Sequence, residues 1–300
     1  MKKKTYLFAL MAMALTLGSC SDNENGIGGE TSKYITVSTS IGNMTRVATD
    51  ANGGQTFEEG DEISVYAWTG DATVAPETRE RVVNNAINKL TNGSWVSTPQ
   101  MLWKNNRDKH YFIGVYPTAA ISDLTAGEYT FDVTKQTESD LLVAVNPDGL
   151  SYSADAQQTV PLTFTHVMAK LVVNLTYKNQ WGGIPTGEKV VVGNAAKEAT
   201  INYLTKVVTP STTTKEDFSL PEITENTKYV SVIIPQEDVK QLTIVIGGKN
   251  FVYDNGTPFK LESGKITTVN LEVGRDEIKL GDVKITDWEN GSTFSGEALN

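Results

Sequence analysis

The stretch that decides the fold class is Tyr34-Ile35-Thr36-Val37-Ser38-Thr39-Ser40-Ile41, which places Ile35, Val37, Thr39 and Ile41 on one face. Such a repeat of period two is typical of a β-strand, in which every second side chain points the same way. The same alternation returns after the turn-like Glu59-Gly60-Asp61, where Ile63, Val65 and Ala67 share a face. Val, Ile and Thr, which favour strands, are frequent in both segments. The sequence therefore predicts a β-rich chain from residue 31 onward.

Further strands are predicted along the rest of the chain, separated by clusters of Gly, Asn, Asp and Pro. Parallel neighbours need long crossover connections, and almost no helical connectors are visible. We therefore expect an all-β fold of antiparallel β-sandwiches. The predicted strands are His110–Tyr116, Tyr129–Val133, Leu162–Tyr177, Lys189–Val192, Ala199–Leu204, Tyr229–Ile234, Leu242–Ile246, Asn250–Tyr253, Ile266–Val273 and Val283–Thr286.

Two interpretations compete for residues 82–96. The apolar residues from Val82 to Leu90 have helical spacing, which favours a short helix. The dipeptide Asn92-Gly93, followed by Trp95 and Val96, is instead typical of a hairpin turn, with residues 87–90 as the incoming strand. We favour the hairpin.

The strand pattern lapses between Asn146 and Thr159, where the chain becomes polar and turn-rich. We place a domain boundary there. The expected organisation is an N-terminal β-sandwich at 47–155 and a C-terminal β-sandwich at 156–300, preceded by two segments, 1–19 and 20–46, that lie outside the sandwiches.

Composition excludes several classes of function. The chain has 300 residues, of which 39% are hydrophobic and 21% charged, as in ordinary folded proteins. One cysteine cannot form an internal disulfide. With only His110 and His166 besides it, the usual ligands of a zinc site and a Cys/His nucleophilic pair are missing. We therefore expect no catalytic residues, no metal and no cofactor. His166, between Phe164 and Met168, is predicted to be a hydrogen-bonded structural histidine.

The charge of the chain argues against a nucleic-acid partner. The formal net charge is −10, and loss of Lys2, Lys3 and Lys4 with the leader leaves 23 basic against 36 acidic residues, or −13. An acidic protein repels phosphate backbones.

The first twenty residues predict export and lipidation. Three lysines precede a short apolar run, Tyr6–Leu17, and Gly18-Ser19-Cys20 follow it. Twelve residues are too few to cross a bilayer permanently, so the run is typical of a removed signal peptide. Leu17-Gly18-Ser19-Cys20 resembles the bacterial lipobox, in which the cysteine is diacylated and becomes the mature N-terminus. Two or more acyl chains, palmitate among them, would anchor the protein stably to the outer membrane.

Several short sequence motifs follow one another along the chain. They are Phe57-Glu-Glu-Gly60-Asp61-Glu-Ile63-Ser-Val65-Tyr66-Ala67, Leu102-Trp103, Tyr111–Pro117, Asp140-Leu141-Leu142-Val143-Ala144, Val160–Leu175 and Ile285-Thr286-Asp287-Trp288. Together with the lipobox, this order resembles the fimbrillin-like lipoproteins, the subunits of type V pili in anaerobic Gram-negative bacteria. Trp103, Tyr116 and Trp288, which lie in three of these segments, also fit an ordinary structural role as aromatic residues of the core or between the domains.

The resemblance implies two transthyretin-like β-sandwich domains in tandem, export as a lipoprotein, maturation by an arginine-specific protease and assembly by strand exchange with other fimbrial subunits, either copies of this chain or related pilins. It places the protein at the cell surface, in a fimbrium, and not among enzymes. We expect the cut between Arg46 and Val47, in a polar connection between two strand patterns.

The predicted cut assigns roles to two strands. Ile35, Val37 and Ile41 would form the inward face of a replaceable strand, because they lie upstream of Arg46. The chain also offers a donor strand, in which Ile278 and Leu280 alternate, and Val283 and Ile285 alternate again after Gly281-Asp282. A groove left with unpaired backbone invites such a strand.

Two other functions compete with this hypothesis. A cell-surface lipoprotein that binds glycans would expose tryptophans for stacking, and Trp68, Trp95 and Trp181 are the candidates. A glycosidase would need two carboxylates converging on one cleft, and none of the 36 acidic residues lies in a motif that supports one.

Overall fold

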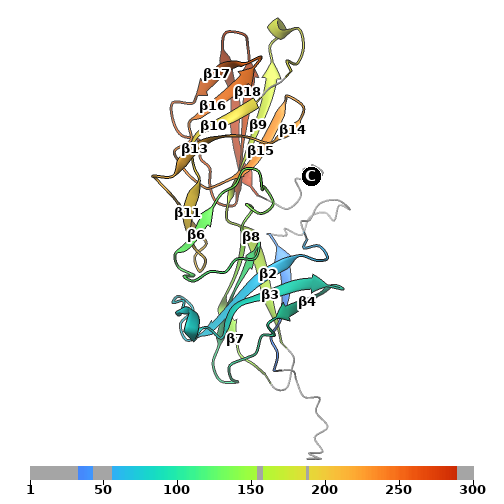
Figure 1. Cartoon of the computed structure of the whole chain (residues 1–300), viewed down its shortest axis with the longest axis vertical. Coiled ribbons are helices and arrows are strands. Elements are labelled where there is room, and N and C mark those ends of the chain that lie inside the picture. Colours follow the sequence, from blue (N-terminus) through green and yellow to red (C-terminus); the bar gives the residue numbers. More distant parts are fainter. Residues whose placement is uncertain (1–32, 43–55, 154–157, 187–188, 289–300) are drawn as a thin grey trace, which may run out of the picture. The chain divides into compact units, whose positions relative to one another are not determined.

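β-Strands make up nearly all the regular structure in the computed structural model, which describes residues 33–42, 56–153, 158–186 and 189–288 (Figure 1). All of these residues fall in one unit, 31–300. The prediction of an all-β chain is confirmed. Only two short 3₁₀ turns, η1 (Thr78–Glu80) and η2 (Asn179–Trp181), interrupt the strands of the described ranges. Within these ranges, no helix has the length and apolar character needed to cross a bilayer.

The largest sheet has seven strands in the order β1-β8-β7-β5-β2-β3-β4. Its strands are β1 (Thr36–Ile41), β2 (Glu62–Thr69), β3 (Val83–Thr91), β4 (Ser94–Thr98), β5 (His110–Tyr116), β7 (Leu142–Leu150) and β8 (Thr159–His166).

Three smaller sheets contain the remaining strands, in the orders β12-β11-β6, β13-β10-β16-β17 and β14-β15-β9-β18-β19. Their strands are β6 (Gly127–Thr130), β9 (Ala169–Tyr177), β10 (Lys189–Ala196), β11 (Glu198–Asn202), β12 (Val207–Pro210), β13 (Lys215–Ser219), β14 (Glu222–Thr224), β15 (Lys228–Ile233), β16 (Gln241–Ile246), β17 (Lys249–Asp254), β18 (Lys265–Val273) and β19 (Ile278–Asp287).

Strand pairing crosses the boundary that we expected between residues 155 and 156. β8 follows that boundary in the sequence but pairs with β1 and β7 of the seven-stranded sheet. β6 precedes it but pairs with β11. The division into two tandem sandwiches stays a prediction. Wherever the boundary lies, β8 pairs with strands that precede it in the sequence.

Most neighbouring strands are antiparallel, as predicted, but two pairs are parallel: β1 with β8, and β9 with β18. Period-two alternation carries no information about strand direction. In both pairs more than 80 residues separate the two strands and form other strands, which supply the crossover that a parallel pair requires.

The predicted strand Leu162–Tyr177 is wrong as a single element. β8 ends at His166 and β9 begins at Ala169, because the chain passes there from the seven-stranded to the five-stranded sheet. Val167 and Met168 are both buried at this passage. Their apolar side chains continue the hydrophobic run, so the break leaves no mark in the sequence pattern.

The hairpin interpretation of residues 82–96 is confirmed. β3 pairs antiparallel with β4 through Leu90↔Trp95 and Thr91↔Ser94. Asn92 and Gly93 form the two-residue turn with φ of 51° and 72°. Positive φ at both central residues matches the twist of the flanking strands, and Asn and Gly tolerate it best. No helix forms over these residues.

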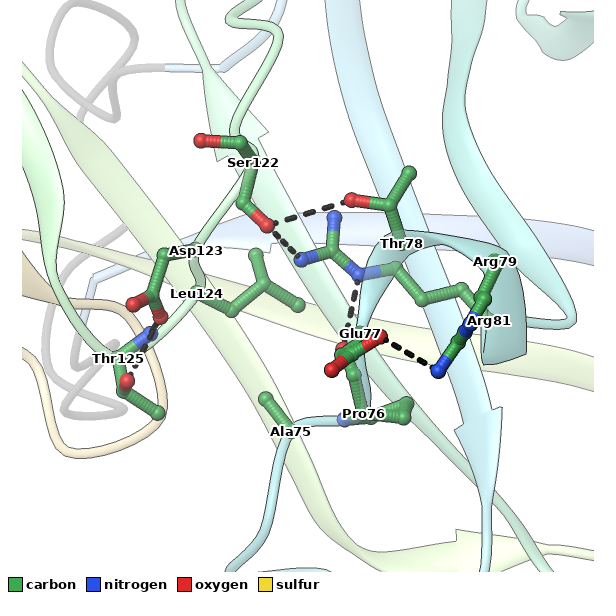
Figure 2. A pocket seen from close by; sticks show the side chains of 10 residues that line it. All are labelled: Ala75, Pro76, Glu77, Thr78, Arg79, Arg81, Ser122, Asp123, Leu124 and Thr125. Atoms are coloured by element: carbon green, nitrogen blue, oxygen red, sulfur yellow. Dashed lines mark hydrogen bonds and ion pairs between the residues drawn. The ribbon is translucent and has the colours of Figure 1, made fainter.

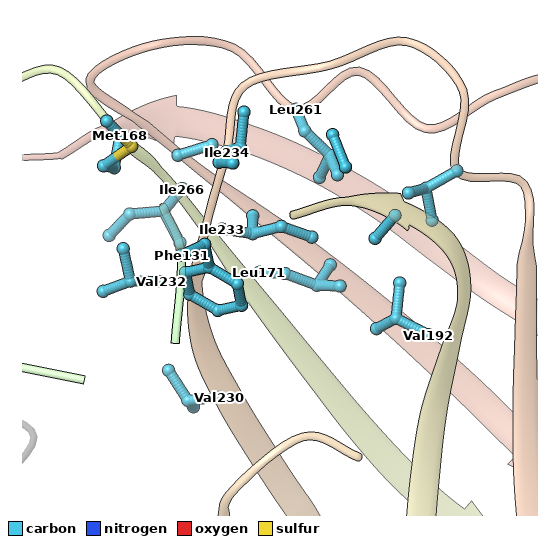
Figure 3. Close-up of a cluster of buried hydrophobic side chains, with 14 of the residues drawn as sticks. Phe131, Met168, Leu171, Val192, Val230, Val232, Ile233, Ile234, Leu261 and Ile266 are labelled. Atoms are coloured by element: carbon cyan, nitrogen blue, oxygen red, sulfur yellow. The ribbon is translucent and has the colours of Figure 1, made fainter. Parts of the chain in front are cut away.

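Buried side chains form two clusters. The first joins the two larger C-terminal sheets with one face of β2 and β5, and Figure 3 shows part of it around Phe131, Leu171 and Ile233. The second fills the inner face of the seven-stranded sheet and includes Ile63, Val65, Phe112 and Phe164, together with residues of β1. β2 and β5 therefore carry buried side chains on both faces.

A close contact inside the second cluster yields a test of its packing. A Cβ added at Gly114 of β5 would lie 2.6 Å from Cζ of Phe164 and 3.1 Å from Cδ1 of Leu162. We expect Gly114→Ala to lower the free energy of unfolding by about 1–3 kcal/mol, because the core must shift to make room. Urea unfolding monitored by tryptophan fluorescence measures this change. Gly193→Ala in β10 is the control, since its nearest neighbours would lie at 3.7 Å. Equal effects at both sites would contradict this packing.

Candidate functional site

β1 is the edge strand of the seven-stranded sheet. It pairs parallel with β8 along its whole length, from Thr36↔Thr159 to Ile41↔Phe164. The Oγ of Ser40 donates a hydrogen bond of 3.2 Å to Oγ1 of Thr163, on the exposed side of this pair.

The inward face of β1 is part of the core. Ile35, Val37 and Ile41 are only 3%, 6% and 9% exposed and belong to the second buried cluster. These are the three residues assigned to a replaceable strand. The structure places them in the sheet, and the replacement itself stays a prediction.

The residues just before β1 pair with the opposite edge of the same sheet. The backbone N–H of Ile35 donates to the carbonyl oxygen of Met101 (3.0 Å), and the N–H of Trp103 donates to the carbonyl oxygen of Lys33 (3.2 Å). Both Met101 and Trp103 lie in the segment that follows β4. The residues that lead into β1 therefore join the β4 edge while β1 itself pairs with β8, and together residues 33–41 close the seven-stranded sheet.

A side-chain hydrogen bond reinforces this closure. Nε1 of Trp95, on β4, donates to Oγ1 of Thr39 on β1 at 3.0 Å. The sequence carries no signal for this contact, because 56 residues separate the two positions and neither belongs to a motif. Thr39 was placed correctly on the same face as Ile35, but its partner had no signal.

The predicted processing sites lie outside the described residues. After β1, the N–H of Gly42 donates to the carbonyl oxygen of Phe164 at 2.8 Å. Arg46 and Val47 fall in the interval 43–55, and Cys20 falls in 1–32, so neither the cleavage site nor the lipidation site is described.

The predicted donor segment forms β19, the edge strand of the five-stranded sheet. It pairs antiparallel with β18, with a bulge at Gly281 that sets Leu280 opposite Leu271 and Asp282 opposite Asn270. A bulge adds one residue and so shifts the alternation. As a result all four predicted donor residues fall on one face of β19: Ile278, Leu280, Val283 and Ile285 lie opposite Val273, Leu271, Val269 and Thr267.

That face of β19 is incompletely covered. Leu280, Val283 and Ile285 are 39%, 38% and 38% exposed, whereas their partners on β18 are buried. β19 therefore holds fewer buried contacts than the strands inside its sheet, as is typical of segments that open at low cost.

The C-terminal end of β19 is held by an aromatic stack. The ring of Trp288 lies 4.0 Å from that of His166 with an interplanar angle of 6°, and Nζ of Lys170 lies 4.7 Å from the Trp288 ring. Nδ1 of His166 is 2.8 Å from Oδ1 of Asp140, which fits the structural role predicted for this histidine. Burial lowers the pKa of Lys170. The stack joins the end of β19 to the end of β8.

The tryptophans suggested for glycan stacking are engaged with the protein. Trp68 is 1% exposed. Trp95 donates its indole N–H to Thr39, and Trp181 donates its own to the carbonyl oxygen of Val273 (3.0 Å). Trp103 and Trp288 are buried, as expected for core aromatics. These positions disfavour a platform of exposed tryptophans.

A surface pocket of about 560 Å³ lies between the η1 segment and residues 122–125 (Figure 2). Its buried arginine, Arg81, donates to the carbonyl oxygens of Ile121 (2.7 Å) and Ser122 (2.6 Å). Burial lowers the pKa of this arginine. Since the guanidinium is committed to backbone carbonyls, Arg81 ties the two segments together. In the described ranges, no group of three His, Cys, Asp or Glu side chains could hold a metal ion.

Comparison with known proteins supports one family. The chain is 25% identical to a protein of Bacteroides uniformis named as a candidate fimbrium subunit, Fim1C, over 99% of this chain and 100% of that protein. Its fold is similar to crystal structures of candidate cell adhesion proteins from B. uniformis (TM-score 0.63, 19% identity, 85% of this chain and 98% of the other) and Bacteroides ovatus (0.61, 18%, 85% and 98%). The fimbrillin-like family model matches residues 45–288. This protein belongs to the fimbrillin-like family.

Proposed function

We propose that this protein is a structural or adhesive subunit of a type V fimbria that assembles by donor-strand exchange. The observation that carries the proposal is the position of residues 33–41. β1 pairs with β8 and its inward side chains complete the core, while the residues just before β1 pair with residues 101–103 at the other edge of the same sheet. Removal of such a strand opens one continuous groove with unpaired backbone on each side.

The proposed cut after Arg46 explains how β1 becomes replaceable. Arg46 lies four residues after Gly42, which follows β1 and is the last residue of the described range 33–42. Cleavage between Arg46 and Val47 would leave β1 bound only by noncovalent contacts. The strand could then leave, because a strand that is no longer covalently attached gains conformational freedom when it dissociates.

β19 is the proposed donor to the next subunit. Its four apolar side chains share one face, as a strand that fills an apolar groove must present them. Because β19 is an edge strand, its departure breaks backbone pairing with one neighbouring strand only, β18. The stack of Trp288 on His166 and the ion pair of Lys265 with Asp287 must open for it to do so.

The names of the relatives support a role at the cell surface. The names of the curated relative and of the structural neighbours describe a fimbrium subunit and cell adhesion proteins. On this basis we propose other fimbrial subunits and an arginine-specific protease as partners, the outer membrane as the attachment site before assembly, and the fimbrium as the final location.

The proposed cut can be tested by N-terminal sequencing of protein sheared from cells. The sequence should begin at Val47, and a sequence that always begins at Cys20 would contradict the cut.

Lipidation at Cys20 gives the first test. Because Cys20 is the only thiol and ends a lipobox-like sequence, Cys20→Ala should leave an unlipidated precursor. Detergent partition and labelling with a fatty-acid precursor measure the difference. Unsubstituted protein should partition with detergent and carry label, and Ser19→Ala serves as the matched control. Unlabelled wild-type protein in the aqueous phase would contradict the lipoprotein.

Deletion of the proposed donor gives the second test. A chain lacking residues 278–300 should form no polymers after cleavage at Arg46, because the donor side chains are gone. It should still fold, since β19 is an edge strand. Polymer ladders on unheated gels, with circular dichroism as the check on folding, measure both properties. A chain lacking only 290–300 is the control. If the 278–300 deletion polymerises as well as the full chain, β19 is not the donor.

A further inference from the structure

We infer that Trp95 selects the strand that takes the place of β1, and that it favours a donor carrying a hydrogen-bond acceptor at the position of Thr39. The inference rests on the proposed function. It makes the donor strand of a different fimbrial subunit, with Ser, Thr, Asn or Asp at that position, a tighter-binding partner than a second copy of this chain.

Trp95 belongs to the part of the chain that remains when β1 leaves. It lies on β4, and its ring meets that of Phe57 edge to face at 5.3 Å. Phe57 in turn contacts the rings of Tyr116 (5.4 Å) and Phe164 (5.1 Å). All four residues follow Arg46 in the sequence. This aromatic cluster therefore holds the indole in place without any contribution from β1.

Thr39 belongs to the part that leaves. The inward positions of β1 are occupied in order by Ile35, Val37, Thr39 and Ile41, so the groove accepts two apolar residues, one hydroxyl and one further apolar residue. Trp95 contacts the hydroxyl position directly, because its Nε1 donates a 3.0 Å hydrogen bond to Oγ1 of Thr39.

The chemistry of the indole makes this position selective. The indole nitrogen can only donate, so an aliphatic residue in the third position leaves the N–H without a protein partner. Backbone pairing with β8 is available to any strand, and apolar pockets discriminate weakly between aliphatic residues. An unpaired donor penalises the wrong strand, which is how interfaces gain specificity beyond affinity.

β19 of this chain lacks the required acceptor. The four residues aligned on its apolar face are Ile278, Leu280, Val283 and Ile285, none of which carries a polar group. A second copy of this chain would therefore leave the Trp95 N–H unpaired wherever one of these residues took the place of Thr39. A related subunit with a hydroxyl or carboxamide there is the better partner.

Strand exchange on the full chain tests the inference. The recognition sequence of a site-specific protease is inserted after Arg46, so that cleavage leaves all residues present and β1 held noncovalently. Synthetic peptides of residues 33–42 then compete with a fluorescent copy of the same peptide, and anisotropy measures their relative affinity. The series contains the native peptide, Thr39→Val, Thr39→Ser and, as control, Ser38→Ala at an exposed position.

The expected result is a loss confined to one position. Thr39→Val should compete about fivefold more weakly than the native peptide, which corresponds to one net hydrogen bond. Thr39→Ser should match the native peptide within about twofold, as should Ser38→Ala. In a chain with Trp95→Phe, which keeps the aromatic ring and removes the N–H, the fivefold difference should vanish.

Two results would overturn the inference while leaving the proposed function intact. One is equal competition by the native and Thr39→Val peptides on the unsubstituted protein, which needs no variant chain. The other is a fivefold difference that persists in the Trp95→Phe chain. If the labelled native peptide never displaces β1 and so never binds, β1 is not replaceable, and the proposed function fails together with the inference.

Discussion

The structure of the N-terminal half depends on one strand that closes a sheet. β1 pairs with β8 on one side, and residues 33–35 pair with residues 101–103 on the other, so residues 33–41 join the two edges of the seven-stranded sheet. Exposed edges are a liability that proteins normally cover. Here the cover is also part of the core, because Ile35, Val37 and Ile41 are buried in it. The same residues that stabilise the subunit would therefore define the shape of the groove once they are gone.

β8 links the two strands to which we assign roles in assembly. Its residue Phe164 pairs with Ile41 and accepts a hydrogen bond from Gly42, whereas His166, two residues further on, stacks on Trp288 at the end of β19. The proposed acceptor groove and the anchor of the proposed donor thus share one strand. A subunit with both roles needs each terminal strand to be held before assembly and released during it.

The fold class followed from alternation in Tyr34–Ile41 and in the other strand segments, and Asn92-Gly93 decided correctly between hairpin and helix. Alternation could not reveal that β1 and β8 run parallel, because strand direction leaves no trace in side-chain period. It also could not reveal the break at Val167–Met168, since both residues are apolar and buried. In the candidate site, the period-two alternation of apolar residues identifies the inward residues of β1 and the apolar residues of β19. The bulge at Gly281 that aligns the latter, and the bond between Trp95 and Thr39, depend on contacts between distant segments.

The most direct test of the account is to lock β1 in place. Ser40 and Thr163 are register partners on the exposed side of β1 and β8, and their hydroxyl oxygens lie 3.2 Å apart, so a disulfide between Ser40→Cys and Thr163→Cys is geometrically reasonable. The chain is cleaved after Arg46 in the oxidised and reduced states, and polymers are counted by electron microscopy. The account predicts polymers only after reduction, with the Ser40→Cys chain polymerising in both states. Equal polymer formation by the oxidised and reduced double variant would show that β1 stays in place during assembly, and would contradict the account.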